Sequence, residues 1–275
     1  MTAKNTNYSW LCLIAIVFSG SLVASEAAIQ AAVDHPSRTE ANTTRDNFRN
    51  PVATLHFFGV QPQHTVVEIS PGAGWYTEIL APLLHDEGTL YAAHFPANSS
   101  SDFAQRSRAA FREKMASHPI YSRVQLSEFA PVEGVQIAPD NSADRVLTFR
   151  NLHNWYMQGG DDAMRVAFNH FYRALKPGGV LGVVEHRLPE DRRDSDWVNS
   201  GYFPQSLAIE LATEAGFEFV GSSDVNANPR DTADHPRGVW TLPPSLRLGE
   251  QDRDRYLTIG ESDRMTLKFR KPQQQ

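Results

Sequence analysis

One stretch of the sequence, HTVVEISPGAGWYTEIL at residues 64–80, constrains the fold more than any other. Its first half, VVEI, is a nearly uninterrupted apolar and β-branched run, which is typical of a strand buried on both faces of a parallel sheet. Gly72 and Gly74 then allow a sharp turn, because a residue without a Cβ atom tolerates backbone conformations that other residues avoid. The apolar spacing after Trp75 predicts a helix, and the free N–H groups at its start face the turn. We therefore predict a strand, a ligand-binding turn and a helix.

The same alternation of strand and helix continues along the chain. Apolar runs predict further strands at 88–95, 121–129, 146–149, 179–187, 217–224 and 265–269. Helical spacing predicts helices between most of them, the clearest starting at Asp161 or Asp162. This order indicates an α/β fold with a Rossmann-like doubly wound, mostly parallel sheet. Its strand ends are expected to form one ligand crevice, from residues 70–75, 94–98, 128–131, 150–155 and 185–190.

The first residues have the order of a secretory signal peptide. An apolar run at 10–18 follows Lys4, and small residues come next, so cleavage is expected between Ala24 and Ala28. The run is short for a membrane span of about 20 apolar residues, so membrane contact is expected only through an uncleaved segment. The sole cysteine, Cys12, lies in this run. We therefore expect an exported, periplasmic or secreted protein whose mature form has no thiol.

The net charge and the composition limit the kinds of partner and the domain organisation that the chain can have. A net charge of −6 without a basic cluster argues against nucleic-acid binding. We predict a signal peptide at 1–27, a linker with helices at 28–62, and one domain at 63–275. Within that domain, the proline-rich and charged residues 226–262 are too long for an ordinary loop, and we expect a lid or an insertion.

Several motifs together give residues 40–270 a resemblance to a known family. VVEISPGAG at the first strand, LKPGG before the fifth and EAGF before the sixth resemble, in order and spacing, the class I S-adenosylmethionine-dependent methyltransferases. PGAGWYTEILAP with FRNLHNW is similar to an exported branch of predicted methyltransferases. The resemblance implies a seven-stranded sheet with an antiparallel last strand. A nicotinamide-binding turn would need a third glycine where Thr77 stands, which argues against NAD.

The resemblance implies S-adenosyl-L-methionine as the cofactor and assigns residues to it. Glu68 is expected to attract the ammonium group of the cofactor, and Ser70 replaces a glycine of the family in the turn that surrounds the methionine end and ribose. His94 stands where an acid normally binds the ribose hydroxyls, and an imidazole makes only one such bond. Glu128 is expected to contact the adenosine end of the cofactor. The predicted cofactor-binding residues are Glu68, Ser70, Gly72, Gly74, His94, Glu128 and Arg150.

Polar and aromatic residues are dense where the fourth and fifth strands end. RNLHNWY at 150–156 offers Asn151 to orient an acceptor and His153 to accept a proton. Methyl transfer from a sulfonium mainly needs alignment, and it needs a base only where the acceptor must lose a proton. Glu185 and His186 end the next strand, and a carboxylate beside an imidazole raises its basicity. The candidate catalytic residues are therefore Asn151, His153, Glu185 and His186.

A purely structural role is the alternative for each of these candidate catalytic residues. His153 suits packing or capping, Asn151 suits binding turn backbone groups, and Glu185 suits an ion pair with Arg187 or Arg150. No HxxxH or cysteine spacing predicts a metal site. No GxSxG motif predicts a serine hydrolase.

The sequence thus predicts methyl transfer from S-adenosylmethionine to a small-molecule substrate. The alternative is an exported ligand-binding protein that keeps the fold without catalysis, since the cofactor is made in the cytoplasm. Nearer the N-terminus, Arg45, Asp46 and Arg49 are either a solvated face or the lining of a cleft.

Overall fold

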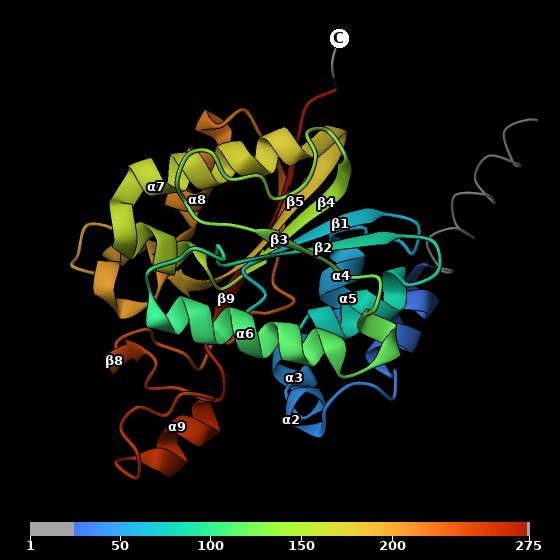
Figure 1. The fold of residues 1–275 in the computed structure, drawn as a ribbon. Coiled ribbons are helices and arrows are strands. Elements are labelled where there is room, and N and C mark those ends of the chain that lie inside the picture. Colours follow the sequence, from blue (N-terminus) through green and yellow to red (C-terminus); the bar gives the residue numbers. More distant parts are fainter. Residues whose placement is uncertain (1–24, 274–275) are drawn as a thin grey trace, which may run out of the picture.

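A central sheet flanked by helices organises the protein in the computed structural model, which describes residues 25–273 (Figure 1). Cys12 and most of the predicted signal peptide lie outside the described residues. The strands follow the order β3-β2-β1-β4-β5-β9-β7, and a short β6 pairs with β5. In chain order these strands are β1 Thr65–Ile69, β2 Thr89–His94, β3 Gln125–Glu128, β4 Ala143–Phe149, β5 Leu175–Leu188, β6 Phe203–Pro204, β7 Glu218–Ser223 and β9 Arg264–Arg270.

Strand β1 lies between β2 and β4 and is parallel to both, so the three strands end at the same edge. Strand β9 is antiparallel to both of its neighbours, β5 and β7. The predicted doubly wound, mostly parallel sheet with an antiparallel last strand is therefore confirmed. The seven strands of the main order match the prediction, and β6 is an eighth strand that the apolar pattern did not reveal.

Successive residues of β1 belong to different helix layers, because side chains alternate across a strand. Val67 and Ile69 pack in a core with helices α7 (Leu152–Ala174) and α8 (Gln205–Glu214), whereas Val66 packs in a core with α4 (Pro51–Phe57) and α5 (Thr77–Leu84). Both faces of the sheet are covered, as the uninterrupted apolar run in β1 predicts. The helices are α2 Glu40–Thr43, α3 Asp46–Arg49, α4 Pro51–Phe57, α5 Thr77–Leu84, α6 Asp102–Ala116, α7 Leu152–Ala174, α8 Gln205–Glu214 and α9 Arg253–Ile259.

The N-terminal region is more helical than the sequence analysis predicted. Residues 25–33 form a helix that spans the predicted boundary between the signal peptide, 1–27, and the linker that follows it. Ile29 and Val33 lie on one face of this helix and are buried in the core with α4 and α5. The hydroxyl of Ser25 also donates a hydrogen bond of 2.8 Å to the carbonyl of Val60. This helix is therefore part of the folded domain.

Two local predictions around the sheet need correction. The third strand begins at Gln125 instead of residue 121, because a 3-10 turn at Pro119–Tyr121 takes up the start of the segment. The LKPGG motif lies within β5 and does not precede it. The pairing shifts there, because Ala143 pairs with Leu175 and Arg145 with Val180, so the intervening residues form a bulge.

Two segments for which no helix or strand was predicted contain regular structure. Most of RNLHNWY is helical, since α7 begins at Leu152 and kinks at Gly159 and Gly160. The second half of α7 therefore starts next to Asp161, as predicted. Residues 226–262 contain β8 Pro236–Val239 and α9 Arg253–Ile259. Within residues 25–273, no helix is long and apolar enough to cross a membrane.

Gly182 in β5 is expected to be required for packing between the sheet and α4. A Cβ atom at this position would lie 2.7 Å from Phe58 and 2.8 Å from Leu147. We expect Gly182→Ala to lower the free energy of unfolding by about 1–3 kcal/mol through overpacking, measured by urea denaturation. Arg112→Ala is the control, because Arg112 is exposed on α6 and surface substitutions usually change stability by less than about 0.5 kcal/mol. An equal loss in both variants would contradict the packing argument.

Candidate functional site

Two cavities lie at the edge where the parallel strands end. The first has a volume of about 270 Å³ and is lined by Glu68 to Ala73 and by Asn151. The second, about 240 Å³, is lined by His153, His186 and Trp240, among others. Three arginines line both cavities: Arg45, Arg49 and Arg150. The two cavities therefore adjoin. The strand ends of β1, β4 and β5 therefore converge as predicted.

The turn after β1 gives the first cavity an open backbone floor. Gly72 has a φ of +58°, and no atom lies within 4 Å of its Cβ position. Ser70 also has a positive φ, +49°, which costs a residue with a side chain about 1–2 kcal/mol. The resemblance places a glycine at this position, and a glycine would avoid this cost. A ligand can thus approach the backbone of this turn closely at Gly72.

Glu68 is a buried carboxylate in the wall of the first cavity. Its side chain accepts a hydrogen bond of 2.6 Å from the hydroxyl of Thr77, the first residue of α5. Burial raises the pKa of Glu68 to about 7 and outweighs the opposing effects of Thr77 and of nearby Lys114 and Arg150. A cationic group in this cavity would favour the ionised form of Glu68.

Aromatic rings form another wall of the first cavity. Tyr76 stacks on Phe149 with ring centroids 3.5 Å apart, and the indole of Trp75 donates a hydrogen bond of 3.0 Å to the carbonyl of Asn42. The guanidinium of Arg49 lies over the Trp75 ring at 4.5 Å. These contacts fix α3 and the start of α5 against the end of β4.

His153 and Glu185 form a buried dyad beside the second cavity. The Nδ1 atom of His153 lies 2.9 Å from a carboxylate oxygen of Glu185, and both side chains are almost fully buried. Because an ionised carboxylate only accepts hydrogen bonds, Nδ1 carries the proton and Nε2 is left as the basic nitrogen. Of the alternatives for Glu185, the structure shows pairing with His153. Arg187 instead forms an ion pair with Asp263 at 2.8 Å.

His186 differs from His153 in its hydrogen-bond partner. Its ring Nδ1 lies 2.5 Å from the hydroxyl of Ser262, and only its backbone N–H donates to Glu185. Burial lowers the pKa of His186 well below its ordinary value, and His153, Arg264, Arg150 and Arg49 lower it further. The predicted pairing of the Glu185 carboxylate with the His186 imidazole is therefore wrong, because the chain turns that ring toward Ser262.

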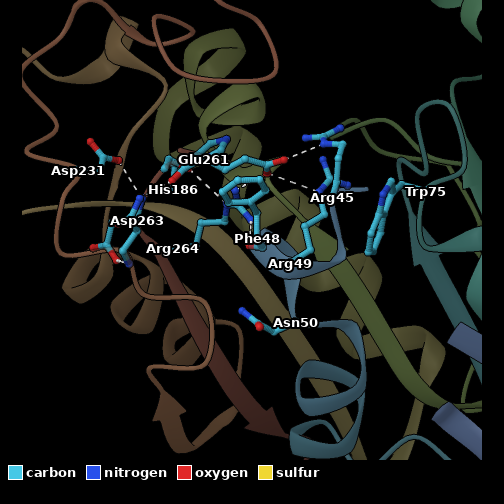
Figure 2. A network of polar contacts seen from close by, with 12 residues as sticks. Arg45, Phe48, Arg49, Asn50, Trp75, His186, Asp231, Glu261, Asp263 and Arg264 are labelled. Atoms are coloured by element: carbon cyan, nitrogen blue, oxygen red, sulfur yellow. Dashed lines mark hydrogen bonds and ion pairs between the residues drawn. The ribbon is translucent and has the colours of Figure 1, made fainter. Parts of the chain in front are cut away.

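Glu261 contacts three arginines that come from two distant parts of the chain (Figure 2). It accepts a hydrogen bond of 2.7 Å from Arg45, pairs with Arg49 at 3.5 Å, and forms a close ion pair with Arg264 at the start of β9. The arginines lower the pKa of Glu261 to about 2 in spite of its burial. Arg45 and Arg49 thus line a cleft, one of the two roles left open by the sequence. Asp46 turns away and pairs with Arg38 at 2.7 Å.

Three predicted cofactor residues line neither cavity. Gly74 faces α6, and a Cβ atom there would lie 3.2 Å from Phe111. The His94 ring contacts the carbonyl of Gly72 at 3.2 Å. Glu128 accepts a hydrogen bond of 3.0 Å from the backbone of Ala97 and lies 3.3 Å from Arg108. These residues have protein partners, so their contact with a cofactor stays a prediction.

Asn151 lines the first cavity and also joins two strand ends. Its amide donates hydrogen bonds of 3.2 Å to the carbonyl of Ile69 and to the hydroxyl of Thr148. Trp240, Glu261 and Arg264 belong to the site but were not predicted. Two of these, Trp240 and Glu261, lie in residues 226–262, where the length of the segment was the only signal.

Within the described residues, His153, Glu185 and His186 bring ligand atoms within 4.8 Å of one another. Such a cluster is compatible with a metal ion in geometry. However, Glu185 already accepts hydrogen bonds from His153 and from the backbone of His186. Arg150, Arg264 and Arg49 act on His186 strongly enough to lower its pKa, and the same positive charges oppose a bound cation. The contacts therefore favour a hydrogen-bonded dyad.

No protein-family model matches the sequence, and no relative is found among curated proteins. Solved structures do resemble this fold. A SAM-dependent methyltransferase from Aquifex aeolicus is 18% identical, with a TM-score of 0.50, over 73% of this chain and 93% of its own. The chain has the class I methyltransferase fold.

Two other structures with this methyltransferase fold have similar scores. The cyclase SpnF is 19% identical with a TM-score of 0.54, over 88% of this chain and 86% of its own. Human N-acetylserotonin methyltransferase, solved in complex with SAM, is 16% identical with a TM-score of 0.52. It is matched over 91% of this chain and 58% of its own. Because SpnF is described as a cyclase, the fold alone does not define the reaction.

Proposed function

We propose that the protein transfers a methyl group from S-adenosylmethionine to a small-molecule acceptor. The observation that carries this proposal is the meeting of two cavities at the strand ends. One has the open glycine turn and Glu68, and the other has the His153–Glu185 dyad. The class I methyltransferase fold supports this activity over other α/β chemistry.

The first cavity fits the methionine end of the cofactor. Glu68 offers a carboxylate to the ammonium group, and the backbone at Ser70 and Gly72 borders open space. When bound, the cofactor supplies an electrophilic methyl group on a sulfonium. The positions of His94 and Glu128 outside both cavities leave the adenosine end to be located by experiment.

The second cavity provides the acceptor side of this proposal. His153 is held by Glu185 with Nε2 as its basic nitrogen, so it suits removal of a proton from a hydroxyl or amine acceptor. The ring of Trp240 lies 6.1 Å from that of His153 and borders the same space. The dyad and this aromatic wall would position the acceptor, and proximity would supply much of the rate.

Cofactor binding is tested by calorimetric titration with S-adenosylmethionine and S-adenosylhomocysteine. We expect Gly72→Val to weaken binding by at least about tenfold, which is about 1.4 kcal/mol, because the new side chain enters the first cavity. Gly134→Val is the matched control, because both glycines have positive φ and no atom near their Cβ positions. Absence of binding to the unmodified protein at millimolar ligand would overturn the proposal.

A non-catalytic ligand-binding protein is the second candidate function. The contact of His94 with the carbonyl of Gly72 favours it, since no acid ends β2 to bind ribose hydroxyls. This candidate predicts that ligand binds without methyl transfer to any acceptor. Export is part of either proposal. Mass spectrometry of the N-terminus of the exported protein tests it.

A further inference from the structure

The second cavity has a large excess of positive charge. Glu261 is the one carboxylate in its lining. Four arginines also line it: Arg45, Arg49, Arg150 and Arg264. Glu261 is already engaged, since one of its oxygens accepts a hydrogen bond from Arg45 and the other pairs with Arg264. Its charge therefore cannot neutralise the remaining arginines.

Arg49 is buried and only partly satisfied by its neighbours (Figure 2). It is 4% exposed, and within the described residues its Nε and Nη1 atoms have no hydrogen-bond partner. Its approach to Glu261, at 3.5 Å, is longer than a good charge-assisted hydrogen bond. Burial and the neighbouring Arg150 lower the pKa of Arg49 to about 8. Such a buried donor without an acceptor is costly, so it indicates a missing anionic partner.

Arg264 shows by contrast what a satisfied buried arginine looks like in this protein. It is 1% exposed, and its guanidinium contacts the carbonyl of Phe48 at 3.0 Å, the Ser262 hydroxyl at 3.3 Å, and the carboxylate of Glu261. Arg264 therefore has no need of a ligand. Arg49 lines both cavities without a comparable set of partners, and a planar guanidinium matches the oxygens of a carboxylate or phosphate.

We propose that the methyl acceptor carries an oxyanion, a carboxylate or a phosphate, which binds Arg49 in the second cavity. This inference rests on the proposed function, because it identifies the class of acceptor for the same site. Trp240, Pro243 and Pro244 line the other part of the cavity, and they suit an apolar or planar body beside the anionic group. The carboxylate of the cofactor would reach the shared arginines from the first cavity, and its single charge leaves a positive excess for the acceptor.

The test uses three probes on the full protein without cofactor, at low ionic strength: benzoate, phenyl phosphate and the neutral analogue benzamide. We expect benzoate or phenyl phosphate to bind at least about tenfold more tightly than benzamide. The tighter of the two anions identifies the source of the oxyanion. Arg49→Met is expected to remove this preference. Arg173→Met is the control, because Arg173 is exposed and pairs only with exposed Asp140.

Thermal unfolding separates this role from a structural one. Because two guanidinium nitrogens of Arg49 are buried without a hydrogen-bond partner among the described residues, removing the charge is expected to offset the loss of the contacts with Trp75 and Glu261, so Arg49→Met should change the unfolding temperature little. A structural role predicts a fall. Should Arg49→Met fail to fold, Arg150→Met and the benzoate–benzamide comparison on the unmodified protein decide the question. Equal affinity for benzoate, phenyl phosphate and benzamide would overturn the inference.

The two proposals fail in different ways. Binding of S-adenosylhomocysteine without any preference for anions would contradict the anionic acceptor and leave methyl transfer standing. Anion binding that depends on Arg49, without binding of S-adenosylhomocysteine, would contradict methyl transfer. Loss of S-adenosylhomocysteine binding alone in Arg49→Met would assign this arginine to the cofactor and overturn the inference.

Discussion

Replacing Glu185 with alanine is expected to lower the free energy of unfolding by about 3–5 kcal/mol. Glu185 is fully buried and accepts three hydrogen bonds: from His153 Nδ1 at 2.9 Å, from the His186 backbone at 2.7 Å, and from the His153 backbone at 3.3 Å. Alanine would leave these donors buried without an acceptor, which is the expensive way to lose a hydrogen bond. Chemical denaturation measures the change.

A surface carboxylate provides the control for this experiment. Glu218 pairs with Arg270 at 2.7 Å, and both side chains are about half exposed, so Glu218→Ala is expected to cost less than about 1 kcal/mol. Glu185→Gln keeps the volume and one acceptor oxygen, and we expect an intermediate loss. Equal effects of Glu185→Ala and Glu218→Ala would show that the dyad does not hold the strand ends together.

The same dyad explains what the sequence could predict about the site. The convergence of His153 and Glu185 follows from topology, because β4 and β5 are parallel neighbours and both end at one edge. Which histidine the carboxylate contacts does not follow from topology. It depends on how the first turn of α7 places His153 against Glu185, and the sequence did not predict that helical turn.

The arginine network was beyond sequence reasoning for a different reason. Arg45 and Glu261 are separated by 216 residues and meet through packing of α2 and α3 against the segment before β9. Nothing in a charged segment with several prolines indicates which acidic residue is buried. By contrast, the sheet was predictable, because β-branched runs and intervening helical spacing are local signals. Burial of Glu68 was implied by its place in an apolar strand, but the size of its pKa shift depends on the tertiary structure.

Glu68→Gln is expected to stabilise the protein at alkaline pH by about 3 kcal/mol. Burial raises the pKa of Glu68 from 4.5 to about 7, so the folded state holds a proton that the unfolded state has lost. The contribution of Glu68 to stability is therefore most favourable below pH 4.5, and it is lost as the pH rises from 4.5 through about 7. Glutamine cannot ionise, so its advantage should be near zero at pH 4.5 and complete at pH 8, measured by urea denaturation.

Exposed Glu113 provides the control, because Glu113→Gln should change stability little at either pH. A Glu68→Gln effect that is equal at pH 4.5 and pH 8 would contradict the shifted pKa.

The same shift links Glu68 to the cofactor: an ammonium group beside the carboxylate favours the ionised form, so binding at pH 7 should release about half a proton. Titration with S-adenosylhomocysteine in buffers of different ionisation enthalpy measures this release, which Glu68→Gln should abolish. Release that persists in the variant would place the ammonium group beside another residue.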